Sequence, residues 1–180
     1  MERVILIGSG GAGKSTLARQ LGARLNIPVI HLDAHFWNPG WIETPRPEWK
    51  EKLSALLTAE RWVMDGNYGN TIAERAALAD TIIFLDFSRY LCLWRAVKRI
   101  IHYYGKTRPD MAPDCPERFD PEFLRWIWNF PKRSRPLLIE GIRNHEAGKQ
   151  VLIFRKPKEV REFLEGMCGG DGNIKVAAGL

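Results

Sequence analysis

The octapeptide GSGGAGKS at residues 8–15 fits the pattern G-x-x-x-x-G-K-[ST] at every position. It follows the apolar run RVILI at residues 3–7 and precedes Leu17, Leu21 and Leu25, whose four-residue spacing indicates one face of a helix. A chance match in a chain of this length is on the order of 1 in 100 at average residue frequencies, and the strand-to-helix context makes coincidence rarer still. The sequence therefore predicts a phosphate-binding loop between its first strand and its first helix.

Each residue type in this loop has a physical reason. Glycines let the main chain turn tightly, so that successive N–H groups converge on anionic oxygens, and the positive end of the following helix adds to the same field. Lys14 supplies a mobile charge for the β- and γ-phosphates, and the Ser15 hydroxyl is suited to ligate Mg²⁺. The alternative is a glycine-rich turn with an incidental lysine. The residues expected to bind ATP here are Gly8, Gly10, Gly11, Ala12, Gly13, Lys14, Ser15 and Thr16.

Beyond the loop, apolar β-rich runs alternate with helical patterns. The runs expected to be strands are residues 3–7, 28–32, 61–64, 81–85 and 151–154. The segments expected to be helices are residues 14–25, 47–59, 70–78, 90–103, 122–130, 131–144 and 157–165. Near-continuous apolar strands separated by helices are typical of a parallel sheet covered on both faces. We therefore expect an α/β three-layer sandwich with a five-stranded parallel sheet in one domain, residues 1–165, followed by a flexible tail, residues 166–180.

The composition is that of an ordinary soluble domain, with 180 residues, 45% of them hydrophobic and 27% charged. No apolar run approaches the roughly 20 residues needed to span a bilayer. The first strand-like run begins at Arg3, so we expect no signal peptide, no membrane partner and a cytoplasmic protein. Cys92, Cys115 and Cys168 form no C-x-x-C pair, which indicates reduced thiols and no structural zinc site.

Two aspartates follow predicted strands at the position where open α/β sheets bind their ligands. Asp65 is expected to hold Mg²⁺ through water, with a plain turn residue as the alternative. Asp33 is expected to orient or deprotonate an acceptor group, and His35 and Trp37 beside it either contact that acceptor or pack against the protein. Asp86 ends the fourth predicted strand and is interpreted as a helix N-cap or turn residue.

A wider resemblance rests on longer stretches. They are GSGGAGKST at 8–16, HLDAHFW at 31–37, WVMDGNY at 62–68, TIIFLDFSRYLCLWRAVKR at 81–99 and TRPDMAPDCPERFD at 107–120. Together they resemble the adenylate-kinase-like branch of P-loop kinases, and within it the topology-modulation (FlaR-related) proteins of bacteria. The resemblance implies a nucleoside-monophosphate-kinase-like fold, an ATP site at the phosphate-binding loop, a helical lid inserted at about residues 100–135, and a small acceptor-binding helix.

The resemblance also implies roles for single residues. Arg95 and Arg99 correspond to the basic pair on the helix leading into the lid, where arginines grip the transferring phosphate. Arg155 and Pro157 lie in a segment that resembles the loop bordering the adenine. The lid lacks the paired cysteines of zinc-bearing kinases, which agrees with the expectation of no structural metal.

One motif departs from the family pattern. Asp65-Gly66 resembles the start of D-G-F-P-R in adenylate kinases, but Gly69 stands where that motif has the arginine for the acceptor's phosphate. Arg46 and Arg75 are candidates to replace it, and Arg46 and Asn67 are expected to contact the acceptor. An ordinary nucleoside monophosphate is therefore a less safe choice of acceptor than the resemblance alone implies.

The net charge of +6 is unevenly placed. No Asp or Glu occurs between Phe87 and Pro109, and Arg95 and Arg99 within that segment lie one helical turn apart. We interpret the segment as an ATP lid; a nucleic-acid surface and a solvated helix face are the alternatives. The same three interpretations apply to the other basic residues in and after this segment, which are Arg89, Lys98, Lys106, Arg108, Arg118, Arg133 and Arg135. The nearby aromatic residues are expected to pack the lid helices onto the core; they are Phe123, Trp126, Trp128 and Phe130.

The sequence as a whole is interpreted as an ATP- and Mg²⁺-dependent phosphotransferase acting on a nucleotide or other small acceptor, with Lys14, Asp33, Arg95 and Arg99 as catalytic residues. The alternative is a DNA-associated ATPase or ATP-switched regulator of DNA topology, although no helix-turn-helix or zinc-finger signature supports it. An ATP-binding remnant with little turnover is a third reading. Whether the protein is a monomer or a dimer stays open.

Overall fold

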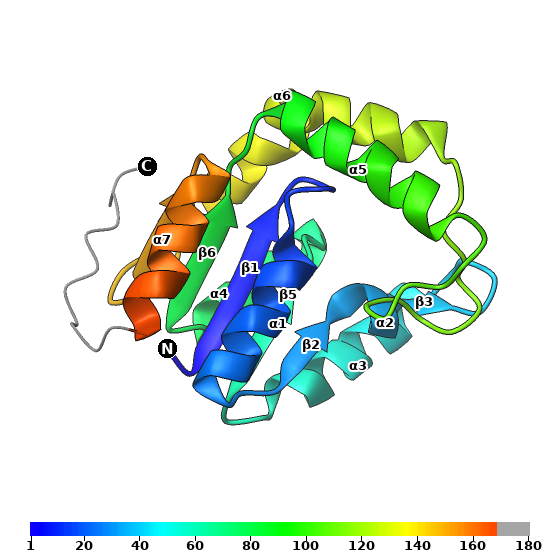
Figure 1. Cartoon of the computed structure of the whole chain (residues 1–180). Helices are drawn as coiled ribbons and strands as arrows, with labels where there is room; N and C mark the ends of the chain where they lie inside the picture. Colours follow the sequence, from blue (N-terminus) through cyan, green and yellow to red (C-terminus); the bar gives the residue numbers. More distant parts are fainter. Residues whose placement is uncertain (169–180) are drawn as a thin grey trace.

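Five parallel strands form the centre of the protein in this computed structural model, which describes residues 1–168 (Figure 1). Their bounds are β1 (Arg3–Gly8), β2 (Val29–His31), β5 (Trp62–Asp65), β6 (Thr81–Leu85) and β7 (Gln150–Phe154). The strands lie in the order β2-β5-β1-β6-β7, and each neighbouring pair is parallel. The predicted α/β fold with a five-stranded parallel sheet is therefore confirmed.

Helices cover both faces of this sheet. Their bounds are α1 (Lys14–Leu25), α2 (Leu32–Phe36), α3 (Arg46–Leu57), α4 (Ile72–Leu78), α5 (Arg89–Tyr103), α6 (Pro121–Arg143) and α7 (Pro157–Cys168). The central strand shows why three layers form: Val4 and Leu6 are buried in one core cluster with α1 and α7, whereas Ile5 and Ile7 are buried in another with α3 and α4. Alternation along a strand sends neighbouring side chains to opposite faces, so each apolar face needs its own helical cover.

The longest helix, α6, corrects a prediction. Residues 122–130 and 131–144 were expected to form two pieces, but α6 runs through Pro131 and Pro136 without a break. Each proline removes one main-chain donor from the helix. Packing offsets this loss, because Ile127 is buried in the first core cluster and Leu138 in the second.

Three short features were not predicted, and several boundaries differ from the predicted ones. The turn at Asn38-Pro39-Gly40 joins a two-stranded hairpin, β3 (Trp37–Asn38) and β4 (Ile42–Glu43), which follows the five-residue helix α2. A single 3₁₀ turn (Gly69–Thr71) precedes α4. Helix α7 continues to Cys168, beyond its predicted end at residue 165, and the rest of the expected tail lies outside the described residues. Within residues 1–168, no helix has both the length and the apolar character to cross a membrane.

The arrangement defines where a site can form. Because all five strands run the same way, Gly8, His31 and Asp65 end their strands at one edge of the sheet. Helices α5 and α6 pack against each other above this edge, and the connection 104–120 between them returns toward the β3–β4 hairpin (Figure 1). Chain segments distant in sequence therefore surround one space at the carboxyl ends of the strands.

Candidate active site

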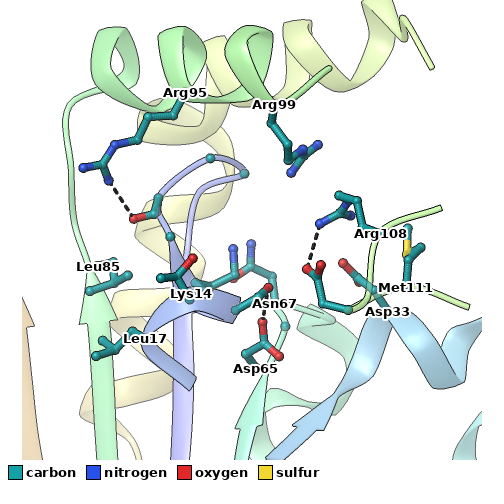
Figure 2. Close-up of a pocket in the computed structure, with 18 of the residues that line it drawn as sticks. Lys14, Leu17, Asp33, Asp65, Asn67, Leu85, Arg95, Arg99, Arg108 and Met111 are labelled. Atoms are coloured by element: carbon teal, nitrogen blue, oxygen red, sulfur yellow. Dashed lines mark hydrogen bonds and ion pairs between the residues drawn. The ribbon is translucent and has the colours of Figure 1, made fainter. Parts of the chain in front are cut away.

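A cavity of about 1260 Å³ lies at this edge, and the residues of the glycine-rich loop form its floor (Figure 2). Gly11 and Gly13 have φ angles of 75° and 97°, which favour glycine. A Cβ on Gly11 would also lie 2.1 Å from the carbonyl oxygen of Cys92. Helix α1 begins at Lys14 with no side chain capping its first turn, so its N-terminal N–H groups suit an anion. This geometry agrees with the predicted phosphate-binding role of the loop.

Lys14 is held at the mouth of the loop. Its Nζ donates hydrogen bonds to the carbonyl oxygens of Gly8 and Ser9, both at 2.9 Å. Burial lowers the pKa of Lys14, while the carboxylates of Asp65 and Asp33 act in the opposite direction. The side chain lines the cavity, so its ammonium group can exchange main-chain oxygens for phosphate oxygens.

Ser15 and Asp65 form the corner where Mg²⁺ was expected. Ser15 Oγ donates to Asp65 Oδ2 at 2.7 Å, and the other carboxylate oxygen lies 2.5 Å from His31 Nδ1. Burial acts to lower the pKa of His31, but the contact with Asp65 leaves it raised. A hydroxyl and a carboxylate are oxygen donors of the kind Mg²⁺ prefers. Within residues 1–168 no cluster of three or more His, Cys, Asp or Glu side chains is arranged to hold a metal ion.

Asp33 lies on α2 and lines the cavity beside this corner. Tyr68 donates its hydroxyl to Asp33 Oδ1 at 2.6 Å. Burial raises the pKa of Asp33 despite that hydrogen bond, and the nearby Asp65 adds to the rise. A carboxylate with a raised pKa is a stronger base than one in water, so Asp33 is suited to accept a proton from a bound hydroxyl group.

The two predicted lid arginines both line the cavity from α5 (Figure 2). Arg95 donates from one terminal nitrogen to the carbonyl oxygen of Ala12 at 3.2 Å, which places it over the loop. Arg99 pairs with Glu117 at 2.9 Å. The other carboxylate oxygen of Glu117 forms an ion pair with Arg108 Nε at 2.8 Å, so one buried carboxylate holds two guanidinium groups at the roof of the cavity.

Several predicted site residues lie elsewhere. His35 and Arg46 are exposed and do not line this cavity, because α2 and the start of α3 turn them outward. Arg155 is also exposed and does not line the cavity. Pro157, two residues later, does line it, as does Arg161 one helical turn further along α7. Trp37 does line the cavity.

Three further polar residues of the prediction have structural partners. Asn67 lines the cavity, but its amide clamps the main chain of Gly8, accepting from N at 3.0 Å and donating to O at 2.7 Å. Arg75 is fully buried and donates to the carbonyl oxygens of Gly66 and Asn67 at 2.9 and 2.8 Å. Asp86 makes two 2.8 Å hydrogen bonds to Arg135, and Ser88 caps α5 instead.

Four residues of the site were not predicted from the sequence. They are His31, Tyr68, Asp110 and Glu117. Burial acts against ionisation of Asp110, but Arg108 at 2.7 Å and the Ser15 hydroxyl leave its pKa lowered. Asp110 and Glu117 lie in a proline-rich connection that has no helical or strand periodicity. The only local signal of their ion pairs is that each has an arginine within two residues.

The fold and the loop position together define a P-loop kinase-like fold of the nucleoside-monophosphate-kinase type. The chain is similar to shikimate kinase from Acinetobacter baumannii in complex with shikimate (TM-score 0.57, 15% identity, 96% of each chain covered). It is also similar to shikimate kinase from Bacteroides thetaiotaomicron (TM-score 0.53, 17% identity, 93% of this chain and 97% of that one). Deoxyadenosine kinase from M. mycoides with bound dATP shares the fold as well (TM-score 0.50, 12% identity, 92% and 98% covered). No protein-family model and no curated protein matches the sequence.

Arg95→Ala and Arg99→Ala are each expected to lower kcat by about 10²-fold while weakening ATP binding less, because charge aimed at a transferring phosphoryl group acts mainly on the transition state. Steady-state kinetics and calorimetry with ATP separate the two effects. Arg89→Ala is the matched control: Arg89 lies on the same helix, but its guanidinium lies over the Trp128 ring, 4.5 Å from the centroid. Wild-type turnover in both cavity variants would contradict the assignment.

Proposed function

We propose that the protein is a kinase that transfers the γ-phosphoryl group of ATP to a hydroxyl group of a small acceptor. The observation that carries this proposal is the convergence, in one cavity, of the glycine-rich loop with Lys14, the Ser15–Asp65 pair and Asp33. An anion site, a cation site and a base within one space are the parts that phosphoryl transfer needs.

The residues have separable tasks in this scheme. The loop amides and Lys14 bind the phosphates, while Ser15 and Asp65 would hold Mg²⁺, which supplies charge neutralisation between the β- and γ-oxygens when bound. Asp33 accepts the proton of the acceptor hydroxyl as its oxygen bonds to the γ-phosphorus and the bond to the β-phosphate oxygen breaks, releasing ADP. Arg95 and Arg99 would close over the phosphates and exclude water.

Calorimetry and a coupled ADP-release assay test the proposal directly. We expect ATP to bind the folded protein in the presence of magnesium, and ADP release to rise when a suitable hydroxyl compound is added. The panel contains nucleosides, nucleotides and other hydroxyl compounds. Absence of any heat of association with ATP or GTP, with the fold verified by circular dichroism, would refute the proposed function.

A second candidate function is favoured by the outer face of α5. Trp94 is 60% exposed there, and the Lys98 ammonium lies 5.3 Å from its ring centroid, so the face offers both stacking and positive charge. A DNA-associated ATPase would bind DNA with an affinity that falls with salt by about 0.9 in log slope per neutralised phosphate. Unchanged ATP hydrolysis with added DNA, together with no salt-dependent binding, would eliminate it.

The narrower relationship to the topology-modulation proteins is part of the same proposal. It is supported by the stretches HLDAHFW and WVMDGNY, which contribute Asp33 and Asp65 to the cavity. A family named for an effect on DNA topology is compatible with either candidate function, so the DNA arm of the assay is the measurement that bears on it.

A further inference from the structure

The cavity has a second end, which adjoins the Ser15 corner of the phosphate-binding loop. This end is lined by Asp33, Tyr68, Asp110 and Met111, and by two tryptophans of the β3–β4 hairpin, Trp37 and Trp41. The two indole rings meet edge to face with centroids 5.4 Å apart, and both pack against the Met111 cluster. The acceptor end is thus a space with aromatic walls and buried carboxyl groups.

The guanidinium groups at the roof of this end are already neutralised. Arg108 pairs with Asp110 at 2.7 Å and with Glu117 at 2.8 Å, and the Arg108 side chain is only 11% exposed. Arg99 shares the same Glu117 at 2.9 Å. An anionic acceptor would have to displace buried carboxylates from Arg108, which is unfavourable because a carboxylate left without its partner stays buried.

Three other arginines do not supply a replacement. Arg75 is fully buried, and its guanidinium is used by main-chain oxygens. Arg46 is exposed outside the cavity. Arg118 lines the cavity but is exposed at its mouth, where its guanidinium lies 5.3 Å from the Trp41 ring centroid. The lining of this end thus includes carboxyl groups and aromatic rings, and its most buried guanidinium, that of Arg108, is already paired.

We propose that the acceptor is an uncharged hydroxyl compound with a ring, such as a nucleoside or a cyclic polyol, and not a phosphomonoester or a carboxylate; this inference rests on the proposed kinase function. Its hydroxyl group lies at Asp33, and its ring packs against Trp37 and Trp41. Negative charge on the acceptor would face the carboxyl group of Asp33, and like charges repel.

Paired acceptors test this specificity. Nucleosides are compared with their 5′-monophosphates, and cyclic polyols with their ring carboxylates, by ADP release with Mg·ATP. We expect kcat/KM for the uncharged member to exceed that of its anionic partner by about tenfold or more, because of like-charge repulsion. A preference for the anionic member would overturn the inference. Calorimetry with ATP alone distinguishes the two proposals. If ATP binds but the anionic acceptor is preferred, only this inference is refuted. If ATP does not bind, the proposed kinase function is refuted.

A charge variant tests the cause of the specificity. Asp110→Asn removes one carboxylate and releases Arg108, so we expect the ratio of kcat/KM for uncharged over anionic acceptors to fall by about tenfold. Asp114→Asn is the matched control, because Asp114 lies in the same connection but is exposed and does not line the cavity. An unchanged ratio in Asp110→Asn, or an equal change in both variants, would overturn the electrostatic explanation.

Discussion

Lys14→Ala should lower phosphoryl transfer by about 10³-fold or more, since it removes a fixed positive charge from a site where charge develops in the transition state. The wild-type ammonium is held 2.9 Å from two carbonyl oxygens of the loop and lines the cavity. Burial lowers the pKa of Lys14, which means that the folded protein carries the cost of desolvating this ammonium group. Removing the side chain removes that cost, so the variant is expected to stay folded. ADP release under saturating ATP measures the loss, and thermal unfolding checks the fold.

The comparison needs a lysine of no functional consequence. Lys158→Ala serves, because Lys158 is 74% exposed and makes a surface pair with Glu162 at 3.3 Å, an interaction that contributes little. Wild-type turnover in Lys158→Ala together with a folded, inactive Lys14→Ala supports the proposed role. Full activity of folded Lys14→Ala would count decisively against the mechanism.

The parts of the fold that the sequence predicted well are those whose signal is local. The loop motif, the apolar strands and the leucine spacing of α1 each depend on residues close together in the chain, and the observed bounds of α1 equal the predicted ones. Asp33 and Asp65 could be predicted because the carboxyl ends of parallel strands share one edge. For such residues, their position after a predicted strand is enough to predict the edge of the sheet at which they lie.

The parts that were missed depend on contacts distant in sequence. The connection 104–120 has no periodicity, and Glu117 enters the site only because Arg99 and Arg108 approach it from α5 and from the same connection. Arg75 was a candidate for the acceptor site, yet its guanidinium donates to main-chain oxygens of the turn after β5. No spacing in the sequence predicts this structural role. The continuity of α6 through two prolines likewise depends on tertiary packing.

Asp33→Asn is expected to reduce kcat by about 10²- to 10⁴-fold, the range for loss of a general base. The amide keeps the size of the side chain and can still accept a hydrogen bond from Tyr68, which lies at 2.6 Å in the wild-type protein. It cannot accept the acceptor's proton. ATP binding, measured by calorimetry, should stay close to wild type, so that the loss appears in turnover and not in affinity.

The pH profile separates a base from a residue that only positions the acceptor. Burial raises the pKa of Asp33, and a base must be ionised, so turnover should fall as the pH drops through this raised pKa. The hydrogen bond from Tyr68 favours the ionised form; Tyr68→Phe should therefore raise the pKa further and shift the acidic limb of the profile to higher pH. Asp33→Asn should lack that limb altogether. An acidic limb that stays in place in both variants would assign the titration to another group and leave Asp33 a positioning role.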